Sequence, residues 1–328
     1  MNSSSFENII PVSSDNPDES IIARAAQLMA DGALVAFPTE TVYGLGANAF
    51  NQDAVANIFR AKERPPTNPI IVHVHDTSSA QQVVSQWPEQ AERLAQAFWP
   101  GPMTLILPKA SCVPDIITAG GDTVAIRIPA HPVALALLRR CGFPVAAPSA
   151  NKSSHISPSR AEHVARDFTP AQVPMILDAG PTIRGIESVV LDITNPSDPR
   201  ILRPGVIPPQ EFEKVLGVTV RFGGHQPQTD RPLRSPGLLT RHYAPQTPLI
   251  LVPKNEADKK MAELVWEGKK VFRMLLPDTP EEAAATLYSI LHQVDEEKVW
   301  DVIVADQPPE EDKWMGVLDR MRRAAAKE

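Results

Sequence analysis

The stretch ALVAFPTETVYGLG, residues 33–46, decides the fold class. It begins with a short apolar run typical of a buried strand and opens at Pro38 into a polar loop that ends in Gly-Leu-Gly. In α/β proteins, loops that follow strands are where ligands bind. A simple strand-to-helix turn would not need Thr39, Thr41 and Tyr43 together. The spacing alone leaves a ligand loop and a plain turn both open.

Strand and helix patterns alternate after this stretch, and one helix precedes it. Apolar residues recur at helical spacing in residues 19–32, 53–62, 89–99, 132–142 and 157–168. Short apolar runs predict further strands at residues 69–74, 103–107, 123–128, 144–147, 175–178, 188–193 and 200–203. Ser157 is the predicted N-cap of the last of these helices, with Pro158 at its first position. The alternation, without heptads or repeats, predicts an α/β domain over residues 1–216.

The chain changes character after residue 216. Residues 217–247 are polar, locally basic and rich in glycine and proline, which predicts a linker. Residues 248–328 alternate again between three apolar runs and three helical patterns, and they predict a smaller α/β domain. Such units often bind nucleotides at the carboxyl ends of their strands, but this one lacks a glycine-rich fingerprint. A nucleotide is therefore not favoured there.

Bulk composition excludes several classes of protein. The 328 residues suffice for about two domains, and a formal net charge of −7 argues against a globally basic nucleic-acid binder. The two cysteines form no CxxC pair, which argues against structural zinc. The polar, acidic N-terminus does not resemble a signal peptide, and no apolar run approaches the roughly 18–20 residues of a membrane span. We therefore expect a cytoplasmic protein without a membrane contact.

A pair of cations marks one candidate site. The sequence has no P-loop, HExxH or GxSxG motif. Instead, FRAKERPPTNPIIVHVH, residues 59–75, places Lys62 and Arg64 just before a rigid Pro-Pro turn. Two cations that lead into a fixed loop suit an oligophosphate or a carboxylate, but they face one way only if the segment is extended. A solvated helix end is the alternative. His73 stands alone in an apolar strand, where a histidine is more often structural than catalytic.

A second polar cluster lies in PVAAPSANKSSHISPSR, residues 144–160. A buried strand opens there into Ser149, Asn151 and Ser157, and a helix follows. Hydroxyls, an amide and a helix N-terminus make a good anion or nucleobase site, although capping and turn chemistry also favour these residues. Three shorter motifs complete the set: GIESVVLDI, ILRPG, and SPGLLTRHYAP in the linker, a segment bracketed by prolines that suits a lid.

Taken in order, these segments resemble a known family, the threonylcarbamoyl-AMP synthases in their two-domain form. The resemblance rests on PTETVYGLG, AKERP followed by NPIIVHV, FWPGPMTLIL, VAIRIPAHPVA, PVAAPSAN, SPSRAEHV, GIESVVLD, ILRPG and SPG…HYAP. It covers almost the whole chain after residue 20. It implies a YrdC-like twisted mixed α/β sheet with helices around a ligand cavity, plus a smaller Rossmann-like three-layer α/β domain.

The resemblance also implies an activity. Members make threonylcarbamoyl-AMP and pyrophosphate from L-threonine, bicarbonate and ATP, with Mg²⁺ accompanying the ATP. The product serves N6-threonylcarbamoyladenosine formation next to the tRNA anticodon, so we expect it to pass to a tRNA threonylcarbamoyl transferase complex. A weak contact with tRNA itself is left open. No covalent nucleophile is required, which agrees with the missing Ser–His–Asp and Cys–His patterns.

Site residues follow from the same resemblance. Lys62 and Arg64 are implied as catalytic. The implied ATP contacts are Lys62, Arg64, Thr67, Ser149, Asn151, Ser157, Arg203 and Tyr243. The implied threonine contacts are Thr39, Tyr43, His73, Arg127 and Ser188. No metal-ligating residue is implied, and the HYAP segment with Tyr243 is the implied lid.

The sequence departs from the family at three positions and leaves two rival functions open. Glu63 and Ser154 stand where the family often has glycine, and Val189 stands where it often has threonine. One rival is a carbamoyltransferase that uses carbamoyl-AMP, although the extra modules of those relatives are not visible in this chain. The other is an RNA-binding module without enzymatic activity, which the acidic net charge disfavours.

Overall fold

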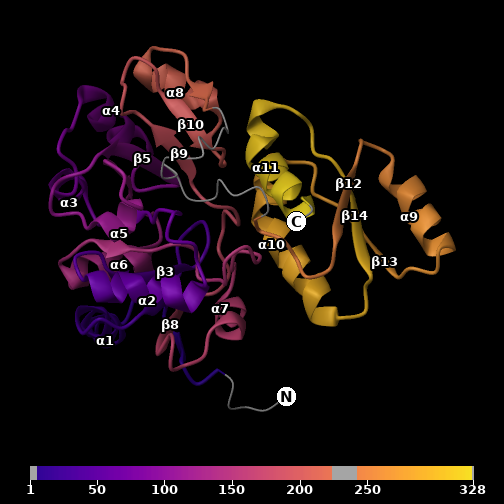
Figure 1. Ribbon diagram of the computed structural model, residues 1–328, viewed down its shortest axis with the longest axis horizontal. Coiled ribbons are helices and arrows are strands. Elements are labelled where there is room, and N and C mark those ends of the chain that lie inside the picture. Colours follow the sequence, from indigo (N-terminus) through magenta and orange to yellow (C-terminus); the bar gives the residue numbers. More distant parts are fainter. Residues whose placement is uncertain (1–5, 224–241, 327–328) are drawn as a thin grey trace.

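The computed structural model describes residues 6–223 and 242–326. Figure 1 shows two lobes, one built from the first two thirds of the chain and a smaller one from the rest. Among the described residues, no helix is both long and apolar enough to cross a bilayer.

A mixed sheet of eleven strands organises the described part of the first lobe, in the order β1-β8-β2-β3-β7-β4-β6-β5-β9-β10-β11. The strands are β1 (Ile9–Pro11), β2 (Val35–Phe37), β3 (Gly44–Asn48), β4 (Val72–His73), β5 (Met103–Pro108), β6 (Thr123–Arg127), β7 (Val145–Ala146), β8 (Met175–Asp178), β9 (Val189–Asp192), β10 (Arg200–Arg203) and β11 (Arg221–Phe222). The last of them lies just beyond residue 216, so the sheet extends past the boundary predicted from the sequence.

Helices pack against this sheet: α1 (Glu19–Ala30), α2 (Gln52–Lys62), α3 (Thr77–Gln82), α4 (Glu89–Phe98), α5 (Asp115–Thr118), α6 (Pro132–Cys141), α7 (Ala161–Asp167) and α8 (Pro209–Leu216). The side chains of β2 alternate between two cores, as period-two geometry requires. Val35 and Phe37 join the cluster under α1 and α6, while Ala36 joins the larger cluster. Both faces of the strand are therefore buried, which explains its unbroken apolar run.

The Gly-Leu-Gly that closes the opening motif forms a strand. β3 pairs antiparallel with β2, so residues 38–43 are the connection of a hairpin. A Cβ built on Gly46 would lie 2.6 Å from the Met29 side chain and 2.8 Å from the Phe37 ring. Close packing, more than flexibility, therefore requires glycine at this position.

The helix predicted to begin at Ser157 begins later. α7 starts at Ala161 with Arg160 as its N-cap residue. The prediction was wrong because the Ser157 hydroxyl is used elsewhere: it donates to the Glu187 carboxylate. The Pro158 carbonyl accepts the Tyr43 N–H at 2.9 Å, so this stretch pairs with the hairpin connection before the helix begins.

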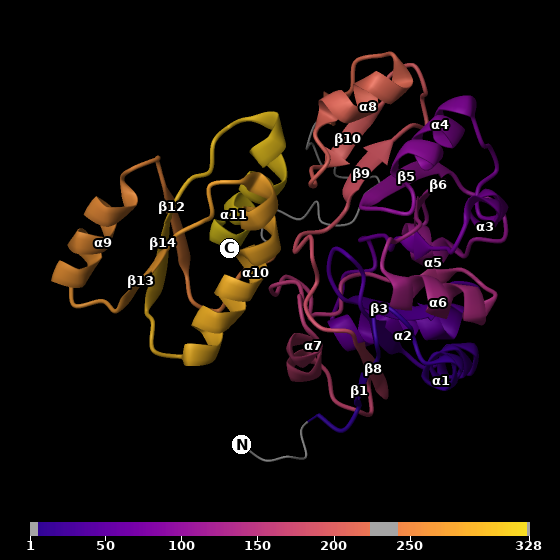
Figure 2. The same cartoon turned by 180° about the vertical axis from the view of Figure 1, so that it is seen from behind.

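The second lobe is a three-layer unit. Its parallel strands lie in the order β12-β14-β13, and α9 covers the outer face while α10 and α11 lie toward the first lobe (Figures 1 and 2). The elements are β12 (Leu249–Val252), α9 (Ala257–Trp266), β13 (Val271–Met274), α10 (Pro280–Glu297), β14 (Val302–Asp306), the 3₁₀ turn η1 (Asp312–Trp314) and α11 (Met315–Ala325). The predicted order of strands and helices is confirmed.

The lobes share a hydrophobic core. Val42, Ile156 and Ile186 of the first lobe pack in one cluster with Leu287 and Met321 of the second. A glycine permits the close approach, because a Cβ on Gly316 would lie 2.5 Å from the Gly205 carbonyl oxygen. The second lobe is therefore docked on the first by direct packing of α10 and α11.

A stacked histidine pair lies in this interface. The rings of His163 on α7 and His292 on α10 have centroids 3.6 Å apart. Burial, with His292 and Arg166 nearby, lowers the pKa of His163 to about 2. Burial also lowers the pKa of His292 to about 4. Its Nε2 donates to the Ser157 carbonyl at 3.1 Å. Both rings are therefore neutral near pH 7.

We predict that acid weakens this interface. Because both pKa values lie below the ordinary histidine pKa of 6.5, the unfolded chain binds more protons in acid. The free energy of unfolding therefore falls as the pH drops from about 6.5 to about 4. Each histidine contributes a slope of roughly 1.4 kcal/mol per pH unit. Urea unfolding at several pH values across this window should show that the free energy of unfolding changes less steeply with pH in His292→Gln than in the wild type. Glutamine keeps a hydrogen-bond donor but does not titrate.

His155 provides the control for this prediction. It is half-exposed beside Asp167, which raises its pKa. Protonation of His155 therefore favours the folded state, so His155→Gln should not reduce the loss of unfolding free energy in acid. Equal slopes for the wild type and His292→Gln would contradict the prediction.

Candidate functional site

The loops that follow the central strands meet around one pocket. Residues from both sides of the opening hairpin, from the loop after β7 and from the start of β9 converge there with the HYAP segment. The lining consists of Thr39, Thr41, Val42, Gly44, Arg64, Ile71, His73, Arg127, Ala147, Pro148, Ser149, Glu187, Ser188, Arg203, His242 and Tyr243.

Buried arginines give the pocket its charge. Arg64, Arg127 and Arg203 are each at most 7% exposed. Arg64 donates to the carbonyls of Asn68 at 3.0 Å and Pro69 at 2.6 Å, and burial lowers its pKa to about 9. A guanidinium has five N–H donors, and the two carbonyls use only some of them. The remaining donors can bind a phosphate or a carboxylate.

Lys62 lies behind this wall of the pocket. Its Nζ donates to the Ser149 carbonyl at 2.7 Å and to the Asn151 carbonyl. Burial and the neighbouring Arg64 hold the pKa of Lys62 well below its usual value. The lysine therefore links the end of α2 to the loop after β7, and it carries a third N–H that these two contacts leave over.

A left-handed turn lets Lys62 and Arg64 both point inward. Lys62 ends α2, and Glu63 follows with a φ of 53°. The Glu63 carboxylate turns outward and forms an ion pair with Lys152 at 2.7 Å. An extended segment is therefore not required, because the left-handed residue Glu63 ends the helix between the two cations.

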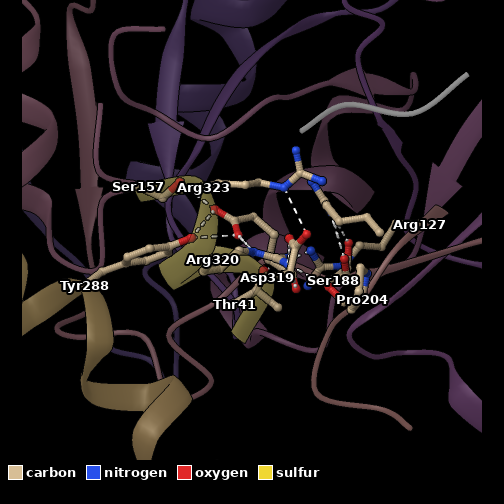
Figure 3. Close-up of polar contacts among 11 residues, drawn as sticks. Thr41, Arg127, Ser157, Ser188, Pro204, Tyr288, Asp319, Arg320 and Arg323 are labelled. Carbon is tan, nitrogen blue, oxygen red and sulfur yellow. Dashed lines mark hydrogen bonds and ion pairs between the residues drawn. The ribbon is translucent and has the colours of Figure 1, made fainter. Parts of the chain in front are cut away.

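The hairpin connection forms the opposite wall. Thr39 Oγ1 donates to the Val42 carbonyl at 2.6 Å, and Arg127 Nη1 donates to Thr41 Oγ1 at 2.9 Å. Arg127 Nη2 lies 2.7 Å from the Glu40 carboxylate, and both side chains are buried. Figure 3 shows the Thr41–Arg127 contact. This wall combines a fixed guanidinium with hydroxyl groups.

Ser188 anchors the third arginine. Arg203 donates through Nε and Nη2 to the Ser188 carbonyl at 3.1 and 2.9 Å, and through Nη2 to Ser188 Oγ at 3.1 Å. The Ser188 hydroxyl also lies 2.7 Å from Thr104 Oγ1. The strand ends of β9 and β10 are thereby joined at the pocket.

Several buried polar atoms of the pocket lack a hydrogen-bond partner within the described residues. They include His73 Nδ1, His242 Nδ1 and the Tyr243 hydroxyl. Burial, with Arg127 nearby, lowers the pKa of His73 to about 3, so this ring is neutral near pH 7. Unpaired buried polar groups are costly, so a polar ligand would satisfy them.

The structure brings most of the sequence-predicted site residues to the pocket lining: Thr39, Arg64, His73, Arg127, Ser149, Ser188, Arg203 and Tyr243. Three others lie behind the lining. Lys62 holds the loop after β7, Asn151 Nδ2 donates to the Lys152 and His155 carbonyls, and Ser157 contacts Glu187.

Two predicted residues lie away from the pocket lining. Thr67 is exposed in the turn after α2. The Tyr43 side chain points away, because Val42 and Gly44 on either side face the pocket, and its hydroxyl donates to the Gly180 carbonyl at 2.7 Å.

The predicted lid falls partly on described residues. His242 and Tyr243 are buried in the pocket, and the Ala244 N–H donates to the Ser154 carbonyl at 2.9 Å. Tyr243 adopts a φ of 61° there. The SPG part of the predicted lid, residues 235–237, lies outside the described residues.

Sequence reasoning assigned no role to Glu187, although it noted the GIESVVLDI segment. The side chain lines the pocket with only 6% exposure. The sequence did contain one signal for this residue, a single carboxylate at the start of an apolar strand. A carboxylate is buried at such a position only if it is paired, so a partner could have been expected.

Within residues 242–326, the second lobe has no comparable site at the carboxyl ends of its strands. The Asp306 carboxylate accepts the N–H groups of Glu256 and Ala257 at the start of α9, both at 3.1 Å. Arg273 pairs with the same carboxylate at 2.6 Å. The position where an α/β unit would hold a phosphate is occupied by the chain itself, which agrees with the missing fingerprint.

Comparison with known proteins agrees with this architecture. The family model Sua5/YciO/YrdC, described as telomere recombination, matches residues 27–205. The model described as the C-terminal domain of threonylcarbamoyl-AMP synthase matches residues 207–326. The chain is 43% identical to a threonylcarbamoyl-AMP synthase of Pyrococcus abyssi, over 92% of this chain and 93% of that protein.

The chain belongs to the threonylcarbamoyl-AMP synthase family. A second relative, from Bacillus subtilis, carries the same name and is 42% identical over 93% of this chain and 92% of its own length. The crystal structure of Pyrococcus abyssi Sua5 complexed with L-threonine superposes with a TM-score of 0.89, at 42% identity and with 97% of both chains covered. The two-domain form and the fold predicted from the sequence are confirmed.

We predict that Glu63→Gly stabilises the protein relative to Glu63→Ala. Both variants remove the exposed ion pair with Lys152, which contributes little. Only glycine relieves the positive φ of 53° at this position, which costs a residue with a Cβ about 1 kcal/mol. In chemical unfolding, the free energy of unfolding of Glu63→Gly should therefore exceed that of Glu63→Ala by up to about 1 kcal/mol. The opposite order would show that the turn is unstrained.

Proposed function

We propose that this chain forms threonylcarbamoyl-AMP and pyrophosphate from L-threonine, bicarbonate and ATP. The observation that carries the proposal is the convergence of Arg64, Arg127 and Arg203 with hydroxyl groups in one buried pocket. Such a pocket suits a ligand set with several negative charges, namely a triphosphate and an amino-acid carboxylate. The threonine complex of the Pyrococcus abyssi relative supports the amino acid as one of them.

The two walls of the pocket divide the roles. Lys62 and Arg64 at the α2 end bind the ATP phosphates, with Ser149, Arg203 and Tyr243 as further nucleotide contacts. Asn151 and Ser157 lie behind the lining and would contact the nucleotide only after a rearrangement, since Asn151 Nδ2 is bonded to two carbonyls and the Ser157 hydroxyl to Glu187. Arg127 pairs with the threonine carboxylate, and Thr39, His73 and Ser188 lie around its amine and hydroxyl. Thr67 and Tyr43 would act only through a rearrangement of their loops, since Thr67 is exposed and the Tyr43 hydroxyl is bonded to Gly180.

The reaction needs positioning more than a nucleophilic side chain. The threonine amine adds to CO₂ with loss of a proton, or to bicarbonate with loss of water, to give an N-carboxylate. An oxygen of this carboxylate attacks the α-phosphorus of ATP, a new P–O bond forms, and the bond to the pyrophosphate leaving group breaks. The buried cations offset the charge of the leaving phosphates. The HYAP segment excludes water from the labile carbamate.

Mg²⁺ enters with ATP as part of the substrate in this proposal. Within residues 6–223 and 242–326, no group of three or more histidine, cysteine or acidic side chains is arranged to hold a metal ion. The one pocket carboxylate, Glu187, already accepts hydrogen bonds from Ser157, Tyr288 and Arg320. The ATP phosphates and water would therefore supply the ligands of the ion.

The product is a mixed anhydride of a carbamate and AMP, and it must reach an acceptor quickly. We propose that it passes to a tRNA threonylcarbamoyl transferase complex in the cytoplasm, with a weak contact between this chain and tRNA. The two rival functions, a carbamoyltransferase and an RNA-binding module, would give no adduct from threonine and bicarbonate.

Mass spectrometry of the products tests the proposal. Wild-type protein with ATP, threonine and ¹³C-bicarbonate should yield pyrophosphate and an AMP adduct that carries the label. Lys62→Ala and Arg64→Ala should each abolish the adduct without unfolding, because each removes a phosphate-binding cation. Arg60→Ala, on the exposed side of α2, is the matched control and should retain activity.

Three outcomes would count against it. Full activity in both site variants would refute the roles of Lys62 and Arg64. An adduct formed only with carbamoyl phosphate would favour the carbamoyltransferase. A salt-dependent shift of tRNA without any ATP turnover would favour the RNA-binding module.

A further inference from the structure

Helices α10 and α11 of the second lobe supply part of the wall behind the pocket. Tyr288 and His292 lie on α10 and Arg320 lies on α11. Each makes a polar contact with a first-lobe residue on or next to the pocket lining. Figure 3 shows Ser157, Tyr288 and Arg320 converging from different elements.

The point of convergence is the Glu187 carboxylate. Arg320 Nε donates to Oε2 at 2.9 Å, and the Tyr288 hydroxyl donates to Oε2 at 3.0 Å. Ser157 donates to Oε1. Arg320 is fully buried, so this is an ion pair inside the protein with one partner from each lobe.

Arg320 also holds two neighbours of the carboxylate. Its Nη1 donates to the Pro204 carbonyl at 2.7 Å, directly after the pocket residue Arg203. Its guanidinium lies 5.3 Å from the centroid of the Tyr243 ring. One second-lobe cation thus contacts the pocket carboxylate, the backbone beside Arg203 and the buried aromatic ring of the HYAP segment.

An unpaired carboxylate here would oppose the proposed ligand. Glu187 lines the same pocket as Arg203, and a free negative charge would repel phosphates and compete for that arginine. By contrast, the Arg127–Glu40 pair on the opposite wall lies entirely within the first lobe. On the Glu187 side, the charge of Arg203 contributes from the first lobe, but the direct ion pair recorded among the described residues comes from Arg320 of the second lobe, which also pairs with Asp319 at 3.0 Å.

We propose that Arg320 is a positioning residue for ATP binding, which it supports from the second lobe by neutralising and orienting Glu187. Tyr288 assists by fixing the same carboxylate. The second lobe thereby completes the pocket of the first. This inference rests on the proposed function only in taking ATP as the ligand.

Isothermal titration of the full-length chain with ATP tests the inference. Arg320→Met should raise the Kd for ATP roughly 10- to 100-fold, as expected when a buried charge loses its partner. Arg320→Lys keeps the charge and should recover most of the affinity. Arg322→Met is the matched control, because Arg322 lies on the same helix but faces solvent and pairs with Glu310; it should bind ATP like the wild type.

Two further measurements separate positioning from a general structural role. In Arg320→Met, Glu187→Gln removes the stranded charge and should restore part of the ATP affinity. In steady-state assays, the KM for ATP should rise much more than the KM for threonine. Tyr288→Phe removes one hydroxyl, so it should fold even if Arg320→Met does not, and it should weaken ATP binding a few-fold.

The outcomes are distinguishable from those that test the reaction. Wild-type affinity in both Arg320→Met and Tyr288→Phe would overturn the inference, as would an affinity loss in Arg320→Met that Glu187→Gln does not relieve. A wild-type chain that binds ATP but forms no threonine adduct would refute the proposed function and leave the titration comparison valid.

Discussion

Burying four cations around one pocket is the constraint on which the rest of this structure depends. Lys62, Arg64, Arg127 and Arg203 are all nearly inaccessible to water. Removing charged groups from water is costly unless they are paired and hydrogen-bonded. The chain meets this cost largely with backbone carbonyls, at Ser149 for the lysine and at Asn68, Pro69, Gly101 and Ser188 for the arginines.

This constraint accounts for the shape of the loops. Carbonyls must point inward, and several belong to prolines, which have a carbonyl but no N–H to satisfy. The carbonyl of Pro69 accepts from Arg64, and that of Pro204 accepts from Arg320. Those of Pro148 and Pro158 accept the N–H groups of Leu45 and Tyr43 in the hairpin. The high proline content of the chain, 34 residues, is therefore partly explained by prolines that fix the backbone of the loops around the pocket.

Much of the fold could be predicted from periodicity. The helix over Ala257–Trp266 and the strands of the second lobe follow the apolar pattern closely. The errors lie where tertiary contacts override local preference. Gly44–Asn48 is a strand because Gly46 packs under Met29 and Phe37, and Ser157 does not cap α7 because its hydroxyl is bonded to a carboxylate thirty residues along the chain.

The candidate site was predictable by residue type but not by arrangement. Arginines, hydroxyls and prolines clustered in loops indicated an anion pocket, and most of those residues line it. Nothing in the spacing could show that Tyr43 would face Gly180, or that Glu187 would be held by Arg320 from the second lobe. Those facts depend on pairings between segments far apart in sequence, which local patterns do not encode.

The most direct test of this account is the effect of ligands on the free energy of unfolding. If the buried cations are the main binding determinant, ATP and inorganic pyrophosphate should both stabilise the full-length chain, and a ligand at 100 times its Kd adds about 2.7 kcal/mol. Adenosine carries the base and ribose without phosphate, and at equal concentration it should add little. Stabilisation by adenosine equal to that by ATP, with none by pyrophosphate, would contradict the account.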